Sequence, residues 1–181
     1  MDRPAFTLLG RRFVAQGRFI TLERAYYLAD GGRWTAREVV RHPGSAAVVP
    51  WDGRRVHLLR QYRAAVGGAL LELPAGKLDV PGETPGQAAA RECAEELGLR
   101  PGRLSLLHVG YTSPGFTDEL TWVYLGEELG PVSPGPQGPE EAAAETVSLS
   151  LDEAAAALDD GSVRDAKTIL GLCSLLRRLG R

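Results

Sequence analysis

Three carboxylates lie close together in the segment RECAEELGL (Arg91–Leu99), because Glu92, Glu95 and Glu96 fall within five residues. The segment is predicted to be helical, and residues three and four positions apart share a helix face, so Glu92 lies beside the other two. Like charges at this spacing cost about 0.2–0.5 kcal/mol per exposed pair, and more where burial lowers the effective dielectric. The one nearby cation, Arg91, cannot neutralise three carboxylates.

Two interpretations of these carboxylates differ in chemistry. Solvated acidic helix faces are common, so the glutamates could simply face water. The alternative is a site for a divalent cation, because Mg²⁺ prefers carboxylate and carbonyl oxygens and keeps waters that a phosphate can displace. Bound cations of this kind can activate water and neutralise the charge of a transferring phosphoryl group. The sequence upstream of the carboxylates favours the second interpretation.

From Gly76 the sequence GKLDVPGETPGQAAARECAEELGL resembles the Nudix box. That motif has a glycine, a spacer, a glutamate, seven residues and then Arg-Glu-aliphatic-x-Glu-Glu-x-Gly-aliphatic. The residues at its fixed positions are Gly76, Glu83, Arg91, Glu92, Glu95, Glu96, Gly98 and Leu99. There are two departures: the spacer is one residue longer than usual, as in ADP-ribose-type members, and Cys93 replaces an aliphatic residue. The resemblance covers 24 residues directly.

The resemblance implies a role for each carboxylate. Glu92 and Glu96 would bind metal, together with the backbone carbonyl of Ala75. Glu95 would be a catalytic residue that binds a further metal or orients water, and Arg91 would hold carboxylates in place. The implied cofactor is Mg²⁺, with Mn²⁺ or another divalent cation as the alternative.

The Nudix box implies hydrolysis of a diphosphate joined to another moiety. The stretches SPGFTDE (113–119) and LLRQYRAAVGGALLELPAGKLD resemble the ADP-ribose pyrophosphatase subgroup, and Pro114 lies fifteen residues after Leu99. A plain Pro-Gly turn is the alternative for SPGF. We therefore expect Mg²⁺-dependent hydrolysis of ADP-ribose to AMP and ribose 5-phosphate. The alternatives are another substrate (a sugar nucleotide, NADH or a dinucleoside polyphosphate), a non-hydrolytic ADP-ribose-sensing module, or a structural domain with an acidic helix.

Four further residues are candidates for substrate binding. Arg63 carries a planar, permanently charged fork that suits phosphate oxygens, although a surface arginine is the alternative. Glu72 could bind a ribose hydroxyl, or a metal through water, or it could merely pair with an arginine. Phe116 and Glu119 could shape the pocket around the distal ribose.

A glutamate on a loop downstream of the box often assists water in the subgroup. The segment PEEAAAE offers Glu140, Glu141 and Glu145, of which Glu141 is the predicted catalytic residue and Glu140 the second choice. All three could instead be solvated loop charges. A loop at this position could close over the substrate and exclude water.

Strands and helices must position these residues. A hairpin is predicted at 19–28 and 33–42, and a second one surrounds Asp52-Gly53, a pair that tolerates positive φ. Thr84, Pro85 and Gln87 form a capping box for a helix that ends before Gly98. Strands are expected at 70–76, 103–112, 119–129 and 145–151, helices at 152–158 and 163–179, and no regular structure at 130–141.

This order of elements does not fit regular βαβ alternation, so a mixed α/β fold with largely non-parallel strands is expected. The resemblance implies a Nudix-type α/β/α sandwich with a mixed β-sheet, plus an N-terminal antiparallel sheet. Residues 1–42 would be a β-hairpin appendage for dimerisation, and 43–181 the Nudix hydrolase domain. The subgroup is usually dimeric, so a homodimer is expected.

Composition limits the remaining possibilities. The 181 residues carry a formal net charge of −2, which argues against a nucleic-acid partner. No apolar run is long enough to span a bilayer, and the N-terminus does not resemble a signal peptide, so no membrane partner is expected. The two cysteines show no zinc or disulfide spacing. We expect a cytoplasmic protein whose partner is a small nucleoside diphosphate derivative.

Overall fold

The computed structural model describes residues 5–135 and 137–181 and contains two compact units. One combines the chain up to Gly44 with Tyr111–Leu120, and the other contains Ser45–Gly110 and Thr121–Arg181. The predicted division into 1–42 and 43–181 stays a prediction, and residues 1–4 of its first part lie outside the described residues.

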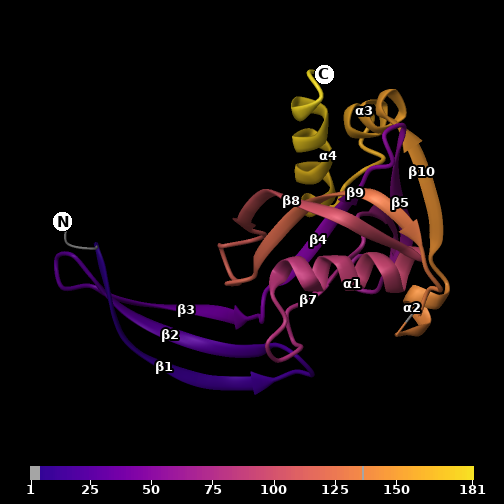
Figure 1. Ribbon diagram of the computed structural model, residues 1–181. Coiled ribbons are helices and arrows are strands. Elements are labelled where there is room, and N and C mark those ends of the chain that lie inside the picture. The colour runs from indigo at the N-terminus through magenta and orange to yellow at the C-terminus, as the bar shows by residue number, and fades with distance from the viewer. Residues whose placement is uncertain (1–4, 136) are drawn as a thin grey trace. The chain divides into compact units, whose positions relative to one another are not determined.

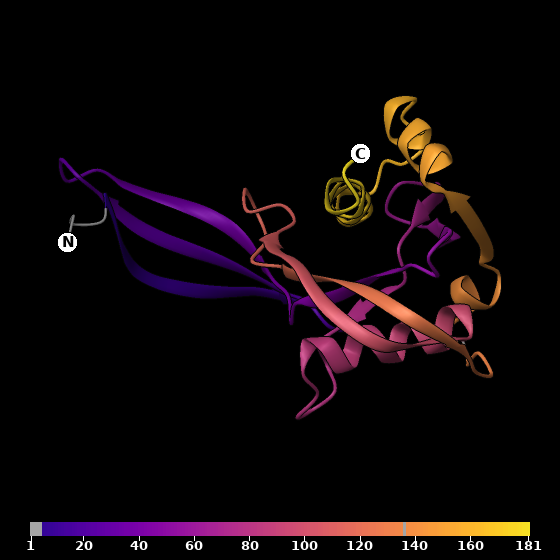
Figure 2. The same ribbon diagram turned by 45° about the horizontal axis from the view of Figure 1, so that its top comes forward.

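The first unit contains an antiparallel sheet in the order β1-β2-β3. Its strands are β1 (Phe6–Gln16), β2 (Thr21–Ala29) and β3 (Trp34–Arg41), and Figure 2 shows them running side by side. The predicted hairpin corresponds to β2 and β3. The apolar and polar residues of β1 do not alternate, which is why its sequence did not reveal a strand. Every residue of β1 is exposed, because it is an edge strand.

The second unit contains two sheets, with strand orders β7-β4-β9-β8 and β10-β5-β6. The strands of the first are β4 (Ser45–Pro50), β7 (Ala75–Lys77), β8 (Leu99–Tyr111) and β9 (Leu120–Pro131). Those of the second are β5 (Arg55–Arg63), β6 (Gly68–Glu72) and β10 (Glu145–Ser150). β4 pairs antiparallel with β7 and parallel with β9, so the sheet is mixed, as predicted.

The faces of β4 belong to two different cores. Ala47 and Val49 lie in a cluster with Leu172 and other residues of the C-terminal helices. Ala46 and Val48 lie in another cluster, with Ala88, Ala89 and Cys93. Because successive strand residues point to opposite faces, α1 (Pro85–Leu97) covers one side of β4 and α4 (Ala166–Arg178) covers the other. Figure 1 shows this layering, which confirms the predicted α/β/α sandwich.

Helix α1 begins and ends where the sequence predicted. The side chain of Thr84 accepts a hydrogen bond from the Gln87 backbone, and the Gln87 side chain accepts one from the Thr84 backbone. Gly98 ends the helix in the left-handed region (φ +66°), which glycine adopts without strain. The carboxylate cluster therefore stands on a helix whose two ends are both fixed.

The C-terminal part of the chain required small corrections. Helix α3 spans Leu151–Asp159, and α4 begins after Asp165, whose side chain caps it. Leu172 and Leu175 of α4 are buried, whereas Ile169 is 38% exposed. The prediction of no regular structure at 130–141 is wrong at both ends, where β9 reaches Pro131 and α2 occupies Pro139–Ala142. Within the described residues, no helix has the length and apolarity needed to cross a membrane.

Candidate active site

Arg91 joins three carboxylates of the Nudix-like segment. Its guanidinium donates to both carboxylate oxygens of Glu83, at 2.9 and 3.0 Å, and to Glu92 and Glu95, at 2.6 and 3.0 Å. Glu96 is not among its partners. One cation is therefore shared by three carboxylates, while the fourth has none on its own helix.

The short strand β7 packs directly against these carboxylates. The backbone N–H of Ala75 donates to Oε2 of Glu96 at 3.1 Å. A Cβ atom at Gly76 would lie 1.8 Å from Oε1 of Glu92, so any side chain there would displace that carboxylate. The structure thus brings together Ala75, Glu92 and Glu96, the three predicted metal ligands.

The electrostatics of the cluster show an excess of negative charge. Burial, followed by the charge of Glu92, raises the pKa of Glu96 to about 8. Burial also raises the pKa of Glu92, and the attraction of Arg91 does not reverse the shift. Since a raised carboxyl pKa reports a charge that its surroundings do not offset, the cluster favours an added cation.

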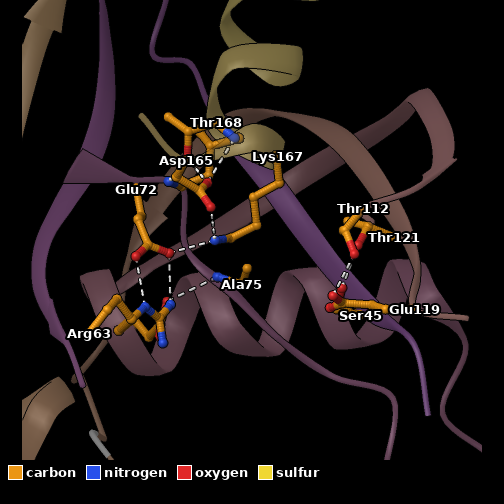
Figure 3. Close-up of polar contacts among 12 residues, drawn as sticks. Ser45, Arg63, Glu72, Ala75, Thr112, Glu119, Thr121, Asp165, Lys167 and Thr168 are labelled. Atoms are coloured by element: carbon orange, nitrogen blue, oxygen red, sulfur yellow. Dashed lines mark hydrogen bonds and ion pairs between the residues drawn. The ribbon is translucent and has the colours of Figure 1, made fainter. Parts of the chain in front are cut away.

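A second charged cluster is formed by Arg63, Glu72 and Lys167 (Figure 3). Arg63 at the end of β5 donates through Nε and Nη2 to the two carboxylate oxygens of Glu72, each at 2.7 Å. Glu72 is only 2% exposed, and Nζ of Lys167 contacts it from α4. The hydrogen bonds that Arg63 donates to Glu72 raise the pKa of Arg63, and the charge of Glu96 raises it further, which connects the two clusters.

Glu72 has the opposite electrostatic character from Glu96. Burial opposes its ionisation, but the hydrogen bonds and charges of Arg63 and Lys167 outweigh burial and lower the pKa of Glu72. The pairing of Glu72 with an arginine, which was the alternative to substrate binding, is present, and the substrate contact stays a prediction. The sequence analysis missed Lys167, whose one signal is that Lys77 is the only other lysine in this arginine-rich chain.

Glu141 lies within electrostatic range of the carboxylate cluster, because its charge contributes to the raised pKa values of Glu92 and Glu96. Gln137 links it to α1. The Gln137 backbone donates to Glu141 at 2.6 Å, and its side-chain amide donates to Glu95 at 2.8 Å. Sequence reasoning missed Gln137, which carries no motif signal in its Pro/Gly-rich loop.

Phe116 and Glu119 belong to the other compact unit. The backbone of Phe116 closes a turn by donating to the Ser113 carbonyl at 3.1 Å, so the Pro-Gly turn is present. The side chain of Phe116 is 56% exposed and lines a pocket of about 350 Å³ with Tyr27 and others. Glu119 accepts a hydrogen bond from the Thr112 hydroxyl at 2.7 Å.

Comparison with known proteins decides the family. The Nudix domain matches residues 40–170 of the chain. The chain belongs to the Nudix family. The ADP-ribose pyrophosphatase of Bacillus subtilis is 33% identical over 88% of this chain and 86% of its own length. That of Mycobacterium tuberculosis is 35% identical over 97% of this chain and 85% of its own length.

More distant relatives of this Nudix protein include proteins named GDP-mannose pyrophosphatase. The crystal structure of an ADP compounds hydrolase has a TM-score of 0.87 at 24% identity, and the match covers 100% of this chain and 99% of that one. This likeness confirms the fold. The predicted family and the prediction of an enzyme are confirmed as well, and Nudix hydrolases generally need a divalent cation.

The residues of this Nudix chain fit such a cation in charge and in donor chemistry. The donors are carboxylate oxygens with raised pKa values, and the lack of a side chain at Gly76 lets the Glu92 carboxylate pack against the backbone next to Ala75. Across residues 5–135 and 137–181, no three His, Cys, Asp or Glu side chains converge into a metal-binding group as they stand. A cation would therefore compete with Arg91 for Glu92, and a backbone carbonyl would complete the donors.

Proposed function

We propose that the protein hydrolyses the diphosphate bond of ADP-ribose to AMP and ribose 5-phosphate, with Mg²⁺ as the cofactor. The observation that carries the proposal is the under-neutralised cluster of Glu92 and Glu96 against Ala75, on a Nudix domain. The names of two relatives over most of the chain support ADP-ribose as the substrate.

The predicted metal-binding, phosphate-binding and catalytic residues each have a defined role in this proposal. Ala75, Glu92 and Glu96 hold the divalent cation, which when bound neutralises diphosphate charge and makes water a better nucleophile. Arg63 binds phosphate oxygens through the guanidinium N–H groups that do not donate to Glu72. Glu141 accepts the proton of the attacking water, and Glu95, held by Arg91 and Gln137, helps to orient that water.

Phe116 and Glu119 remain proposed substrate contacts on the basis of the sequence resemblance. The same chemistry on a sugar nucleotide or NADH is the second candidate, and the relatives named GDP-mannose pyrophosphatase favour testing it. A sensing module would bind ADP-ribose without turnover. A structural domain would neither bind Mg²⁺ nor gain thermal stability from it.

The deciding experiment incubates the purified protein with ADP-ribose and Mg²⁺, with EDTA as control, and identifies the products by chromatography. AMP and ribose 5-phosphate that disappear with EDTA are expected. Turnover of GDP-mannose or NADH but not ADP-ribose would replace the substrate, and binding without any turnover would support the sensing module.

We also propose that two copies of the chain associate through the sheet of β1, β2 and β3. Among the described residues β1 pairs with β2 alone, so its outer edge is open, and it exposes large apolar side chains, including Phe6 (55% exposed), Leu9 (59%) and Phe13 (63%). Exposed apolar edges of this kind are sites of association. Light scattering should give a dimer mass that Phe13→Glu reduces, whereas a monodisperse wild-type monomer would refute the proposal.

A further inference from the structure

Glu72 is a buried carboxylate with two counterions. Both of its oxygens accept hydrogen bonds from Arg63, and Oε2 also contacts Nζ of Lys167 at 2.5 Å. Removing the counterion of a buried charge is strongly destabilising. If Arg63 were the single counterion of Glu72, binding a phosphate would draw its charge away and leave the buried carboxylate without a counterion, which is destabilising.

The two counterions are held differently. The side chain of Arg63 is 40% exposed, whereas that of Lys167 is 15% exposed. Lys167 also contacts Oδ1 of Asp165 at 3.0 Å, and Asp165 is fixed in turn by the backbone and hydroxyl of Thr168 (Figure 3). Lys167 is therefore anchored to the start of α4, while Arg63 reaches solvent.

The geometry of Arg63 leaves it able to bind a second anion. A guanidinium has five N–H donors, and Glu72 takes two of them, through Nε and Nη2. Three donors, five minus two, remain for other acceptors. The strength of the attraction between Glu72 and Arg63 therefore determines how tightly these donors can bind a phosphate.

We propose that Lys167 is a positioning residue for substrate binding: it neutralises Glu72 permanently, so that Arg63 can stay oriented by Glu72 and still share its charge with a diphosphate. This inference rests on the proposed function, because it takes the ligand of Arg63 to be the substrate diphosphate. Lys167 itself acts through Glu72 and contacts no substrate.

The test is a double-mutant cycle on steady-state kinetics with ADP-ribose. Lys167→Met should raise KM about tenfold, the loss of roughly one charge-assisted hydrogen bond, with a much smaller change in kcat. Lys167→Arg should retain most of the affinity for ADP-ribose. Arg178→Met, which removes an exposed cation from the same helix, is the matched control and should leave KM unchanged.

The cycle separates a counterion from a merely structural residue. In a Glu72→Gln background, Lys167→Met should change KM less than twofold, because the charge that Lys167 neutralises is gone. An unchanged KM in Lys167→Met, or an equal effect in both backgrounds, would overturn the proposal. If Lys167→Met does not fold, Lys167→Gln keeps hydrogen bonding without the charge and takes its place.

Failure of the proposed function would be seen separately. If the wild type turns over a sugar nucleotide or NADH instead of ADP-ribose, the cycle is run on that substrate. If it turns over none of them, the proposed function fails. Coupling between Lys167 and Glu72 is then read from thermal unfolding without substrate, and its absence would overturn the counterion role as well.

Discussion

Two charged clusters lie in the unit that contains Ser45–Gly110 and Thr121–Arg181. Each has a buried glutamate, but the pKa values of these two glutamates shift in opposite directions. Burial disfavours the charge of Glu72 and of Glu96 alike. Two cations of the chain nevertheless lower the pKa of Glu72, whereas the pKa of Glu96 rises to about 8 beside Glu92. The cations of the chain neutralise the cluster around Glu72, but they do not neutralise the cluster that contains Glu92 and Glu96.

The contrast indicates where each kind of ligand is needed. In a cluster that is already neutral, one cation can share its charge with an anionic ligand. A cluster with excess negative charge is completed by a cation from solution. In the proposed function, anion binding at Arg63 is thus separate from cation binding at Glu92 and Glu96, although the charge of Glu96 contributes to the raised pKa of Arg63.

The strongest way to break the contrast is to remove a charge from the unbalanced cluster. Glu96→Gln should lower kcat about 10²–10³-fold, because a divalent cation contributes several kcal/mol and each 1.4 kcal/mol is about tenfold in rate. Steady-state assays with Mg²⁺ measure this. Asp159→Asn, an exposed change on α3, is the control, and near-normal turnover of Glu96→Gln would refute the ligand assignment.

The glutamates of α2 give the next largest effect. Glu141→Gln should lower kcat about 10²-fold, within the range of general-base catalysis, with little change in KM. Glu140→Gln is the matched neighbour and should lose less than about threefold, far below that range. Equal losses in both variants, or an unchanged rate in Glu141→Gln, would move the role elsewhere.

The pH dependence of stability should differ in sign between the clusters. The folded pKa of Glu96 is about 8 against an ordinary 4.5, so the unfolded state releases its proton first and stability falls as pH rises between those values. We expect a loss of about 1–2 kcal/mol, because a half-buried carboxylate is partly screened by solvent. The lowered pKa of Glu72 acts in reverse: its contribution is present above 4.5 and is lost in acid.

Urea titrations at several pH values in EDTA measure both limbs. Glu96→Gln should flatten the decline toward alkaline pH and leave the acid limb in place, whereas Glu72→Gln should flatten the acid limb. A decline toward pH 8 that survives in Glu96→Gln would show that another group causes it.

The smallest effect is stabilisation by the cation. At ten times its dissociation constant, Mg²⁺ should add about 1.4 kcal/mol to the free energy of unfolding, a rise of roughly 3–6 °C in Tm for a chain of this size. Differential scanning fluorimetry measures this with and without EDTA. The rise should vanish in Glu96→Gln but persist in Lys167→Met, and a rise in neither the wild type nor Lys167→Met would refute the cation site.

The sequence predicted those parts of the site whose contacts are local. The carboxylates, Arg91 and the capping residues of α1 lie within one segment, so their spacing placed them on one helix. Their roles in the site came from the resemblance to the Nudix box. Lys167 was missed because its partner Glu72 is 95 residues away in the chain. Gln137 was missed for a similar reason, since it contacts Glu95 across 42 residues.

The fold shows the same division. Helix ends followed from local cap residues such as Thr84 and Gly98, and the β2–β3 hairpin was predicted correctly. The hairpin predicted around Asp52-Gly53 is wrong, because β4 and β5 belong to different sheets and, in the described part of the chain, are joined there only by a bridge between Trp51 and Val56. The parallel pairing of β4 with β9 was not predicted, because parallel partners need a long connection that no local pattern specifies. β1 was likewise hidden, since an edge strand with two exposed faces has no need of alternation.

The two-faced burial of β4 also has a kinetic consequence. Its six residues, SAAVVP, place a small residue followed by a valine on either side, so a slip of one residue would exchange two similar faces. The register must then come from the partner β9, which pairs Ser45 with Thr121, 76 residues away. Closing so long a loop is slow, so β4–β9 pairing should limit the rate of refolding. Since α1 packs on β4, the carboxylate cluster would acquire its buried environment only after that step.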